Sequence, residues 1–257
     1  MIIPLADDNS DRRTRPYVTW LFIGINIFVF VILQGLGGNS DFTYAFSTVP
    51  AEILQGRDIV TPDQVVQDPQ TGRQFRVPGL EPTPIPVIFT LITSMFMHGG
   101  FAHILGNMLF LFVFGDNVED RLGHGRFTVF YLLVGILASF AHIFASASFG
   151  SDLQVPSLGA SGAISGVLAG YLLLFPKKRV NVLMFRILMP VPAIVAIGVW
   201  FLFQLLNGLG ALGGGAGVAY GAHIGGFIAG LILVKLFDRG GQGPGRGGRQ
   251  RFYSTRR

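Results

Sequence analysis

The chain has 257 residues, of which 50% are hydrophobic and only 13% charged, and its mean hydropathy is +0.54. This composition excludes an ordinary soluble domain of the same length and predicts a membrane protein that crosses the bilayer several times. The net charge is +5, but the basic residues cluster beside apolar runs instead of on one folded face, so we expect no nucleic-acid partner.

Apolar runs recur along the chain, each close to the roughly 20 residues that cross a ~30 Å hydrocarbon core. Backbone groups in lipid must satisfy their own hydrogen bonds, which favours helices over open strands. The sequence therefore predicts an all-α polytopic membrane protein with six transmembrane helices. The predicted helices cover residues 17–35, 101–117, 127–149, 159–176, 189–207 and 218–237.

Three segments complete the predicted organisation around the membrane domain of residues 17–237. Residues 1–16 form a short charged N-terminal arm. Residues 38–100 form a long first connection, whose apolar end, Val87–Gly100, is too short to span and is predicted to be an interfacial or re-entrant helix. Residues 238–257 are rich in glycine and arginine and have little to bury, so we expect a disordered tail with affinity for anionic lipid.

The distribution of basic residues predicts the orientation of the helices. All but three of the 19 Lys and Arg residues lie in the N-terminal arm, the second and fourth connections, the end of the last helix and the tail. The exceptions, Arg57, Arg73 and Arg76, lie in the first connection. By the positive-inside rule, both termini are cytoplasmic, the first connection is extracytoplasmic, and the protein is multi-pass in a cell (inner) membrane of bacterial type.

A serine and a histidine lie at the same predicted depth. Ser161 precedes Lys177 by sixteen residues, and His223 precedes Arg239 by sixteen. At 1.5 Å per residue, each lies about 24 Å above the cytoplasmic boundary. The fourth and sixth predicted helices run in the same direction, so the two side chains can meet below the outer surface.

Small residues repeat every fourth position on both of these helices, a pattern that lets two transmembrane backbones pack tightly. Such faces also occur with Ser and His as ordinary interhelical contacts. The spacing alone therefore leaves a catalytic pair and a packing pair both open. The residues are Gly162, Gly166 and Gly170 on the fourth helix, and Ala222, Gly226 and Gly230 on the sixth.

A serine hydroxyl needs a base within hydrogen-bond reach to act as a nucleophile, and a neutral imidazole suits that task. Asp116, at the cytoplasmic end of the second helix, is the one carboxylate within the apolar runs. A Ser161–His223 dyad is therefore the serine chemistry available, without a triad. The chain has no cysteine and no His-Glu-x-x-His motif, so we expect no metal and no cofactor.

Two polar residues on the second predicted helix are candidate donors for an oxyanion. His103 and Asn107 are four residues apart on one helix face and fall in the same outer half of the membrane as Ser161. Their side-chain N–H groups, together with the backbone N–H of Ser161, could stabilise the negative charge of a tetrahedral intermediate. Polar residues at such depth are costly and are functional candidates.

Four motifs follow one another along the predicted helices. They are His98-(x4)-His103-(x3)-Asn107, Gly115-x-x-Val118-Glu119-x-x-x-Gly123, Gly159-Ala160-Ser161-Gly162 and Ala222-His223-x-x-Gly226-x-x-x-Gly230. In this order they resemble the motifs of the rhomboid intramembrane serine proteases, over about residues 87–235. The resemblance implies a six-helix bundle in which Ser161 is the nucleophile, His223 the general base, and His103 and Asn107 the oxyanion donors. It also implies a structural role for Glu119, a lateral gate near the fifth helix and a mobile cap at Gly208–Gly217.

The chain departs from this family pattern at one position beside the predicted site. Many relatives carry an aromatic residue four positions after the nucleophile, where it stacks on the base, but this chain has Ser165. Ser165 is predicted to hydrogen-bond within or between helices. The sequence leaves open what orients His223 instead.

We therefore expect a serine endopeptidase that cleaves transmembrane protein substrates near the outer leaflet, surrounded by membrane lipid. The alternative is a catalytically silent rhomboid-like protein that binds transmembrane clients, and the presence of both Ser161 and His223 argues against it. A small-solute transporter is a third class, disfavoured because no charged residue lies in the middle of a predicted helix. The sequence does not indicate an oligomeric state.

Overall fold

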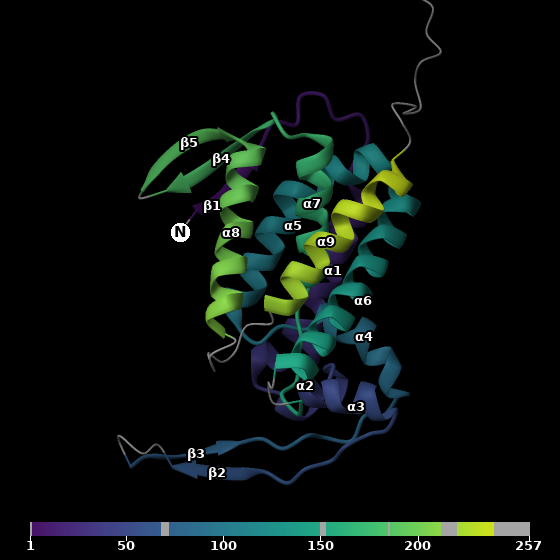
Figure 1. The fold of residues 1–257 in the computed structure, drawn as a ribbon, viewed down its shortest axis with the longest axis vertical. Coiled ribbons are helices and arrows are strands. Elements are labelled where there is room, and N and C mark those ends of the chain that lie inside the picture. Colours follow the sequence, from purple (N-terminus) through teal and green to yellow (C-terminus); the bar gives the residue numbers. More distant parts are fainter. Residues whose placement is uncertain (1, 68–71, 150–152, 185, 212–219, 239–257) are drawn as a thin grey trace, which may run out of the picture.

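The long apolar segments form helices that lie side by side in an elongated bundle (Figure 1). The computed structural model describes residues 2–67, 72–149, 153–184, 186–211 and 220–238. The described part of the chain is mostly helical, in agreement with the sequence. The predicted tail lies almost wholly outside it, as does most of the predicted cap at Gly208–Gly217.

Each of the six predicted apolar runs is helical over most of its length. The helices are α1 (Tyr17–Phe28, continued by the π-helical turn η1, Val29–Leu33), α5 (Phe101–Leu122), α6 (His124–Phe149), α7 (Ser161–Leu174), α8 (Ala193–Ala211) and α9 (Tyr220–Phe237). Three of them, α5, α6 and α9, are long and apolar enough to cross a membrane by themselves. The apolar helices Tyr17–Leu33, Ser161–Leu174 and Ala193–Gly208 are shorter.

The helices are accompanied by five short strands among the described residues, so the all-α part of the prediction is corrected. β1 (Ile2–Asp7), β4 (Arg179–Met184) and β5 (Ile187–Pro192) form an antiparallel sheet in the order β1-β4-β5, and β2 (Gln64–Gln67) pairs with β3 (Gln74–Val77). The predicted fifth helix therefore starts too early, since residues 189–192 belong to β5. Pro190 and Pro192 lack the N–H groups that a helix interior requires and are tolerated in this edge strand.

The three-stranded sheet attaches the N-terminal arm to one end of the bundle (Figure 1). Val180 and Val182 of β4 are buried in the main core, while Arg179 and Asn181, which alternate with them, are exposed. This alternation is typical of a strand with one buried face. The predicted arm of residues 1–16 is thus a folded part of the bundle end.

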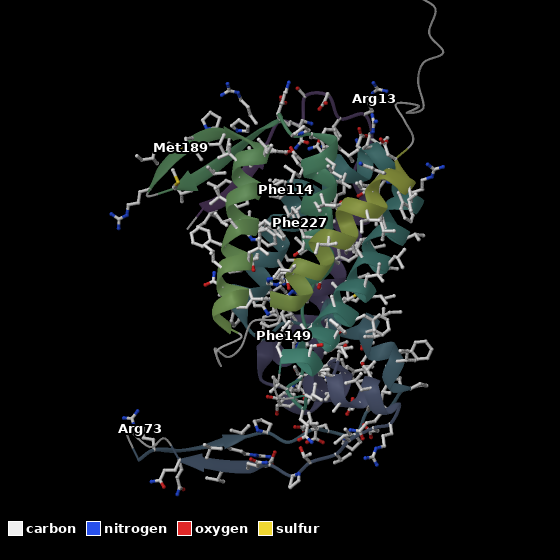
Figure 2. The ribbon with its side chains drawn as sticks, in the orientation of Figure 1. Arg13, Arg73, Phe114, Phe149, Met189 and Phe227 are labelled. Atoms are coloured by element: carbon white, nitrogen blue, oxygen red, sulfur yellow. The ribbon has the colours of Figure 1, made fainter. Side chains whose placement is uncertain are left out.

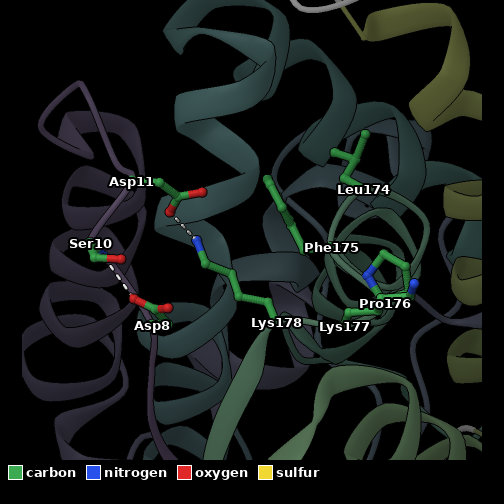
Figure 3. A pocket seen from close by; sticks show the side chains of 8 residues that line it. All are labelled: Asp8, Ser10, Asp11, Leu174, Phe175, Pro176, Lys177 and Lys178. Carbon is green, nitrogen blue, oxygen red and sulfur yellow. Dashed lines mark hydrogen bonds and ion pairs between the residues drawn. The ribbon is translucent and has the colours of Figure 1, made fainter.

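An open pocket lies where the arm meets the end of α7 (Figure 3). The Lys178 Nζ donates to Asp11 Oδ1 at 2.6 Å, and the backbone N–H of Ser10 donates to Asp8 Oδ1 at 3.0 Å. Leu174, Phe175 and Pro176 complete the wall. The pocket is therefore at the opposite end of α7 from Ser161.

The long first connection folds at the other end of the bundle (Figure 1). Its helical elements are α2 (Ser40–Phe46), α3 (Pro50–Gln55), η3 (Val87–Phe89), α4 (Thr90–Thr93) and η4 (Ser94–Phe96). Val49, Ala51 and Leu80 form a small apolar cluster of their own. Figure 2 shows Arg13 and Arg73 near opposite ends of the molecule, Arg73 beside the projecting β2–β3 hairpin.

Helix α7 is the centre of the bundle. Its residues from Gly162 to Tyr171 are all buried, and it packs against α5, α6 and α9. Phe114 of α5 and Phe227 of α9 lie within the same core (Figure 2). Helix α8 is peripheral and exposes Leu202, Phe203 and Leu206, so α7 is enclosed by its neighbours whereas α8 presents an apolar face outward.

Candidate active site

Ser161 and His223 are hydrogen-bonded to each other. Ser161 is the first residue of α7 and His223 lies in the first turn of α9. The Nε2 atom of His223 lies 2.8 Å from the Ser161 Oγ. The two side chains that the sequence predicts at equal depth therefore meet, at the distance that proton transfer from a hydroxyl to an imidazole requires.

Glycines and alanines bring α7 and α9 together at this point. A Cβ atom added at Gly230 would lie 2.5 Å from the Gly166 Cα, and one added at Gly226 would lie 2.1 Å from the Gly162 carbonyl oxygen. A larger residue at either position would push the helices apart. The close crossing keeps the hydroxyl and the imidazole within bonding distance.

His103 lies on the other side of the loop that carries Ser161. A Cβ atom added at Gly159 would lie 2.8 Å from both Cε1 and Nε2 of His103 and 3.6 Å from the Ser161 Oγ. Gly159 also has a φ of +126°, a left-handed value that glycine adopts without strain. The absence of a side chain at Gly159 therefore leaves a narrow space between His103 and Ser161.

His103 and Asn107 each have a side-chain N–H group that is available to donate to an oxyanion. The backbone N–H of Gly99 donates to His103 Nδ1 at 3.3 Å, so in the neutral imidazole the proton is on Nε2, the atom beside Gly159. Asn107, one turn further along α5, is 8% exposed, and its Nδ2 has no hydrogen-bond partner among the described residues. A buried N–H group without a partner is costly and is suited to receive an oxyanion.

A small cavity of about 20 Å³ adjoins Ser161. Its volume is enough for one water molecule, and polar groups are available to bind it. It lies where α6, α7 and α9 meet the first connection. Its lining includes Ser94, Ser139, Ser157, Gly159, Ser161 and Ala222.

The first connection supports the loop before Ser161. The backbone N–H of Gly159 donates to the Ser94 carbonyl at 2.8 Å, and Thr48 and Ser157 form a β-bridge. The Thr48 hydroxyl in turn lies 2.9 Å from the Ser94 Oγ. The sequence analysis did not identify these contacts, because they join parts of the chain more than 40 residues apart.

Ser165 does not contact the imidazole by hydrogen bonding. Its side chain is fully buried and donates to the Ser161 carbonyl at 2.6 Å, within its own helix. His223 instead bonds through Nδ1 to the Gln204 Oε1 of α8 at 2.7 Å. The rings of Trp200 and Tyr220 each lie 6.2 Å from the imidazole. Neither aromatic residue lies at the position four residues after Ser161, since Trp200 is on α8 and Tyr220 precedes His223 on α9.

Glu119 connects the far end of α5 to α1 and α6. Its buried carboxylate accepts hydrogen bonds from the backbone N–H groups of Val18 and Thr19 at 2.9 and 2.7 Å, and from the Thr19 hydroxyl at 2.7 Å. The His124 Nδ1 lies 2.6 Å from the same carboxylate. Glu119 thus fixes the end of the bundle opposite the Ser161–His223 pair.

Two further histidines at this end of the bundle, His98 and His142, have no hydrogen bond to Ser161 among the described residues. His98 is buried, and its backbone N–H and carbonyl both bond to the Gln34 side chain, at 2.9 and 3.0 Å. The backbone of His142 lies against α9, since a Cβ atom at Gly221 would be 3.2 Å from its Cα. Among the described residues, no group of three or more His, Cys, Asp or Glu side chains is placed to hold a metal ion.

Comparison with known proteins agrees with this geometry. Residues 87–239 match the family model of the Rhomboid domain. The chain is 29% identical over 225 residues to the Rhomboid protease GluP of Bacillus subtilis (strain 168), a match that covers 87% of this chain and 35% of the relative. It is 32% identical over 146 residues to Rhomboid protein 1, mitochondrial, of Saccharomyces cerevisiae, covering 56% of this chain and 40% of the relative.

A third relative is the presenilin-associated rhomboid-like protein, mitochondrial, of Mus musculus, 28% identical over 170 residues, or 62% of this chain and 44% of the relative. The chain thus spans less than half the length of each of these relatives. The Rhomboid domain, however, covers more than half of the chain and contains Ser161, His223, His103 and Asn107. The chain therefore belongs to the rhomboid family of membrane proteins.

Proposed function

We propose that this protein is an intramembrane serine endopeptidase that cleaves transmembrane protein substrates near the outer leaflet. The observation that carries the proposal is the 2.8 Å contact between the Ser161 Oγ and the His223 Nε2. Both residues belong to apolar helices, and their side chains are partly exposed. A pair that only held two helices together would be more stabilising if it were fully buried. A nucleophile, in contrast, must be accessible to its substrate.

The proposed mechanism uses the Ser161–His223 dyad. His223 takes the hydroxyl proton as Ser161 attacks a substrate carbonyl, and the His103 Nε2–H, the Asn107 Nδ2–H and the Ser161 backbone N–H stabilise the oxyanion. His223 then protonates the leaving amine. A water molecule hydrolyses the acyl-enzyme with His223 as base, and the cavity beside Ser161 provides room for one.

The lengths of the helices support a site below the outer surface. At 1.5 Å per residue the 14 residues of α7 extend about 21 Å, less than a ~30 Å hydrocarbon core. Phe175 and Pro176 separate its end from Lys177 and Lys178. If the end of α7 lies at the cytoplasmic boundary, its first residue, Ser161, lies about 9 Å below the outer edge of the core.

The charge distribution supports a six-span topology with both termini cytoplasmic, in a cell (inner) membrane. Arg12, Arg121 and Lys178 gather at the bundle end that carries the three-stranded sheet, and the first connection covers the other end. By the positive-inside rule the sheet end is cytoplasmic. In this arrangement the short helical turns of Val87–Phe96 form the interfacial or re-entrant segment beside the site.

Cleavage of a model transmembrane substrate in proteoliposomes tests the proposal. We expect wild-type protein to cleave the substrate, and Ser161→Ala and His223→Ala to reduce cleavage to background while their thermal unfolding is unchanged. A matched control is Ser148→Ala, a serine of α6 outside the site. Cleavage that persists in Ser161→Ala would refute the mechanism. Binding of the substrate without cleavage by wild-type protein would support the silent client-binding alternative.

A further inference from the structure

His223 has a hydrogen-bond partner on each side of its ring. Its Nε2 faces the Ser161 Oγ at 2.8 Å, and its Nδ1 faces the Gln204 Oε1 at 2.7 Å. Gln204 is on α8, and among the described side chains of this helix it is the one that hydrogen-bonds to the imidazole. The imidazole is thus held between the central helix α7 and the peripheral helix α8.

The Gln204 contact determines which ring nitrogen carries the proton. An amide oxygen only accepts hydrogen bonds, so the Nδ1 of His223 must be the donor. A neutral imidazole has one N–H group, and the Nε2 lone pair is then free to accept from the Ser161 hydroxyl. The opposite orientation of the amide would place the proton on Nε2, and Ser161 would lose the acceptor for its proton.

Other neighbours of His223 do not supply this acceptor. Ser165 donates to the Ser161 carbonyl at 2.6 Å and is fully buried. Trp200 and Tyr220 contribute ring surfaces at 6.2 Å from the imidazole centroid, inclined at 39° and 86°. These rings can restrict the tilt of the imidazole, but an indole N–H cannot accept a hydrogen bond.

An amide suits this position better than a carboxylate. In a soluble serine hydrolase, a buried Asp holds the histidine in the correct tautomer. A carboxylate inside an apolar bundle would carry a large desolvation cost, whereas a neutral amide that makes its hydrogen bond costs much less. Gln204 therefore offers the orienting function of the third triad member without its charge.

We propose that Gln204 is a positioning residue that fixes His223 in the Nδ1–H tautomer and thereby prepares Ser161 for attack. The inference rests on the proposed serine protease function. It also makes the base sensitive to α8: a displacement of this exposed, peripheral helix breaks the Gln204–His223 bond and removes the preferred tautomer. The position of α8 thus affects, through the Gln204 side chain, whether His223 can accept the proton of the Ser161 hydroxyl.

Two substitutions of Gln204 test this role. Gln204→Met keeps the length and volume of the side chain but removes the acceptor, and Gln204→Glu keeps the acceptor and adds a charge. With a model transmembrane substrate, we expect Gln204→Met to lower kcat by about 10- to 100-fold, with KM changed less than about twofold because substrate contacts remain. We expect Gln204→Glu to recover part of kcat and to move the acid limb of the pH–rate profile to higher pH.

Asn207→Leu is the matched control. Asn207 is an exposed amide on the same helix, and its Nδ2 donates to the Phe203 carbonyl of its own helix at 2.7 Å. We expect kcat and the pH profile of this variant to equal those of wild type. Wild-type kcat in Gln204→Met, or equal losses in Gln204→Met and Gln204→Glu with an unchanged pH profile, would overturn the proposal in favour of simple packing.

A spectroscopic measurement separates this inference from the proposed function. The ¹⁵N resonances of His223 in labelled protein distinguish a protonated Nδ1 from a protonated Nε2 without any substrate. We expect the Nδ1–H tautomer in wild type and in Gln204→Glu, and loss of that preference in Gln204→Met. An Nε2–H tautomer in wild-type protein would overturn the role of Gln204. Absence of proteolysis alongside the expected Nδ1–H signal would reject only the protease.

Discussion

Gly226 of α9 lies directly on the backbone of Gly162 of α7: a Cβ atom at Gly226 would be 2.1 Å from the Gly162 carbonyl oxygen. Gly162 immediately follows Ser161, and Gly226 lies three residues after His223. The contact between these two glycines therefore lies close to the dyad in both helices. The distance between the Ser161 hydroxyl and the His223 imidazole therefore depends on two glycines that take no part in the proposed reaction.

Gly226→Ala is therefore expected to lower both stability and activity. The added methyl group has no room, and overpacking of this kind costs about 1–3 kcal/mol. A shift of α9 by about 1 Å would lower the rate of cleavage on the order of 100-fold. Thermal unfolding in detergent and the cleavage rate measure the two effects.

Gly24→Ala on α1 is the control, because a Cβ atom there would meet nothing within 4 Å. Replacing a helical glycine by alanine at an open position is expected to leave activity unchanged and to raise stability by up to about 1 kcal/mol. If Gly226→Ala were as stable and as active as Gly24→Ala, the close crossing would not hold the dyad together.

Glu119→Gln is expected to destabilise the bundle from the opposite end. The carboxylate accepts bonds from two backbone N–H groups and the Thr19 hydroxyl and lies 2.6 Å from the His124 ring. An amide would turn its own N–H group toward some of these donors, which would then lack an acceptor. Each buried donor left without an acceptor lowers the stability of the folded protein by about 1–3 kcal/mol. The drop in unfolding temperature measures this effect, with Asp41→Asn on the exposed end of the first connection as control. An unfolding temperature equal to that of the control would contradict the structural role of Glu119.

The first connection should lose stability as the pH rises through neutrality. Burial of Glu52 raises the pKa of its carboxyl from 4.5 to about 7, partly offset by a hydrogen bond from the Ile59 backbone N–H, and the nearby Asp58 adds to the increase. Because the folded pKa is the higher one, the folded state binds this proton more tightly. The resulting stabilisation is fully present below about pH 4.5 and is lost as pH rises through about 7.

Glu52→Gln removes this dependence, because a neutral amide keeps an acceptor for Ile59 without charge. We expect the variant to unfold at a higher temperature than wild type at pH 8 and at a similar temperature at pH 5. Hydrogen exchange of residues 49–59 at the two pH values locates the effect. Glu81→Gln, on the same connection, controls for a change in net charge. A difference between Glu52→Gln and wild type that does not vary with pH would contradict the assigned titration.

The proposed topology can be tested by thiol labelling without background, since the chain has no cysteine. We expect a membrane-impermeant maleimide to label Gln64→Cys in β2 on intact spheroplasts, and to label Ser10→Cys in the N-terminal arm only after permeabilisation. Both positions are exposed, so accessibility reports the side of the membrane. The reverse pattern would place the Ser161–His223 pair near the cytoplasmic leaflet.

The helices and the dyad could be predicted from the sequence because both depend on local patterns. The lengths of the apolar runs predict the helices. The equal sequence distances from Ser161 to Lys177 and from His223 to Arg239 predict that the two side chains lie at the same depth in the membrane. The strand β5 could not be predicted in this way, because residues 187–192 form one apolar run with α8. In that run a short apolar strand and the start of an apolar helix have the same composition.

The support of the site depends on contacts between distant residues and was therefore not predictable. Gln204 has no sequence feature that separates it from other polar residues near a helix end; its position beside His223 follows from the packing of α8 on α9. The same holds for the Gly159–Ser94 bond, which depends on how the first connection folds over the bundle. The absence of an aromatic at Ser165 did indicate that another residue must orient the base.

The most direct test of the central claim is the reaction of a fluorophosphonate with purified protein, followed by mass spectrometry of the labelled peptide. We expect a single adduct on the Ser161 side chain in wild type, at least 100-fold slower labelling in His223→Ala because the hydroxyl loses its base, and no adduct in Ser161→Ala. Labelling of Ser161 at the same rate without His223, or labelling at another serine only, would contradict the account.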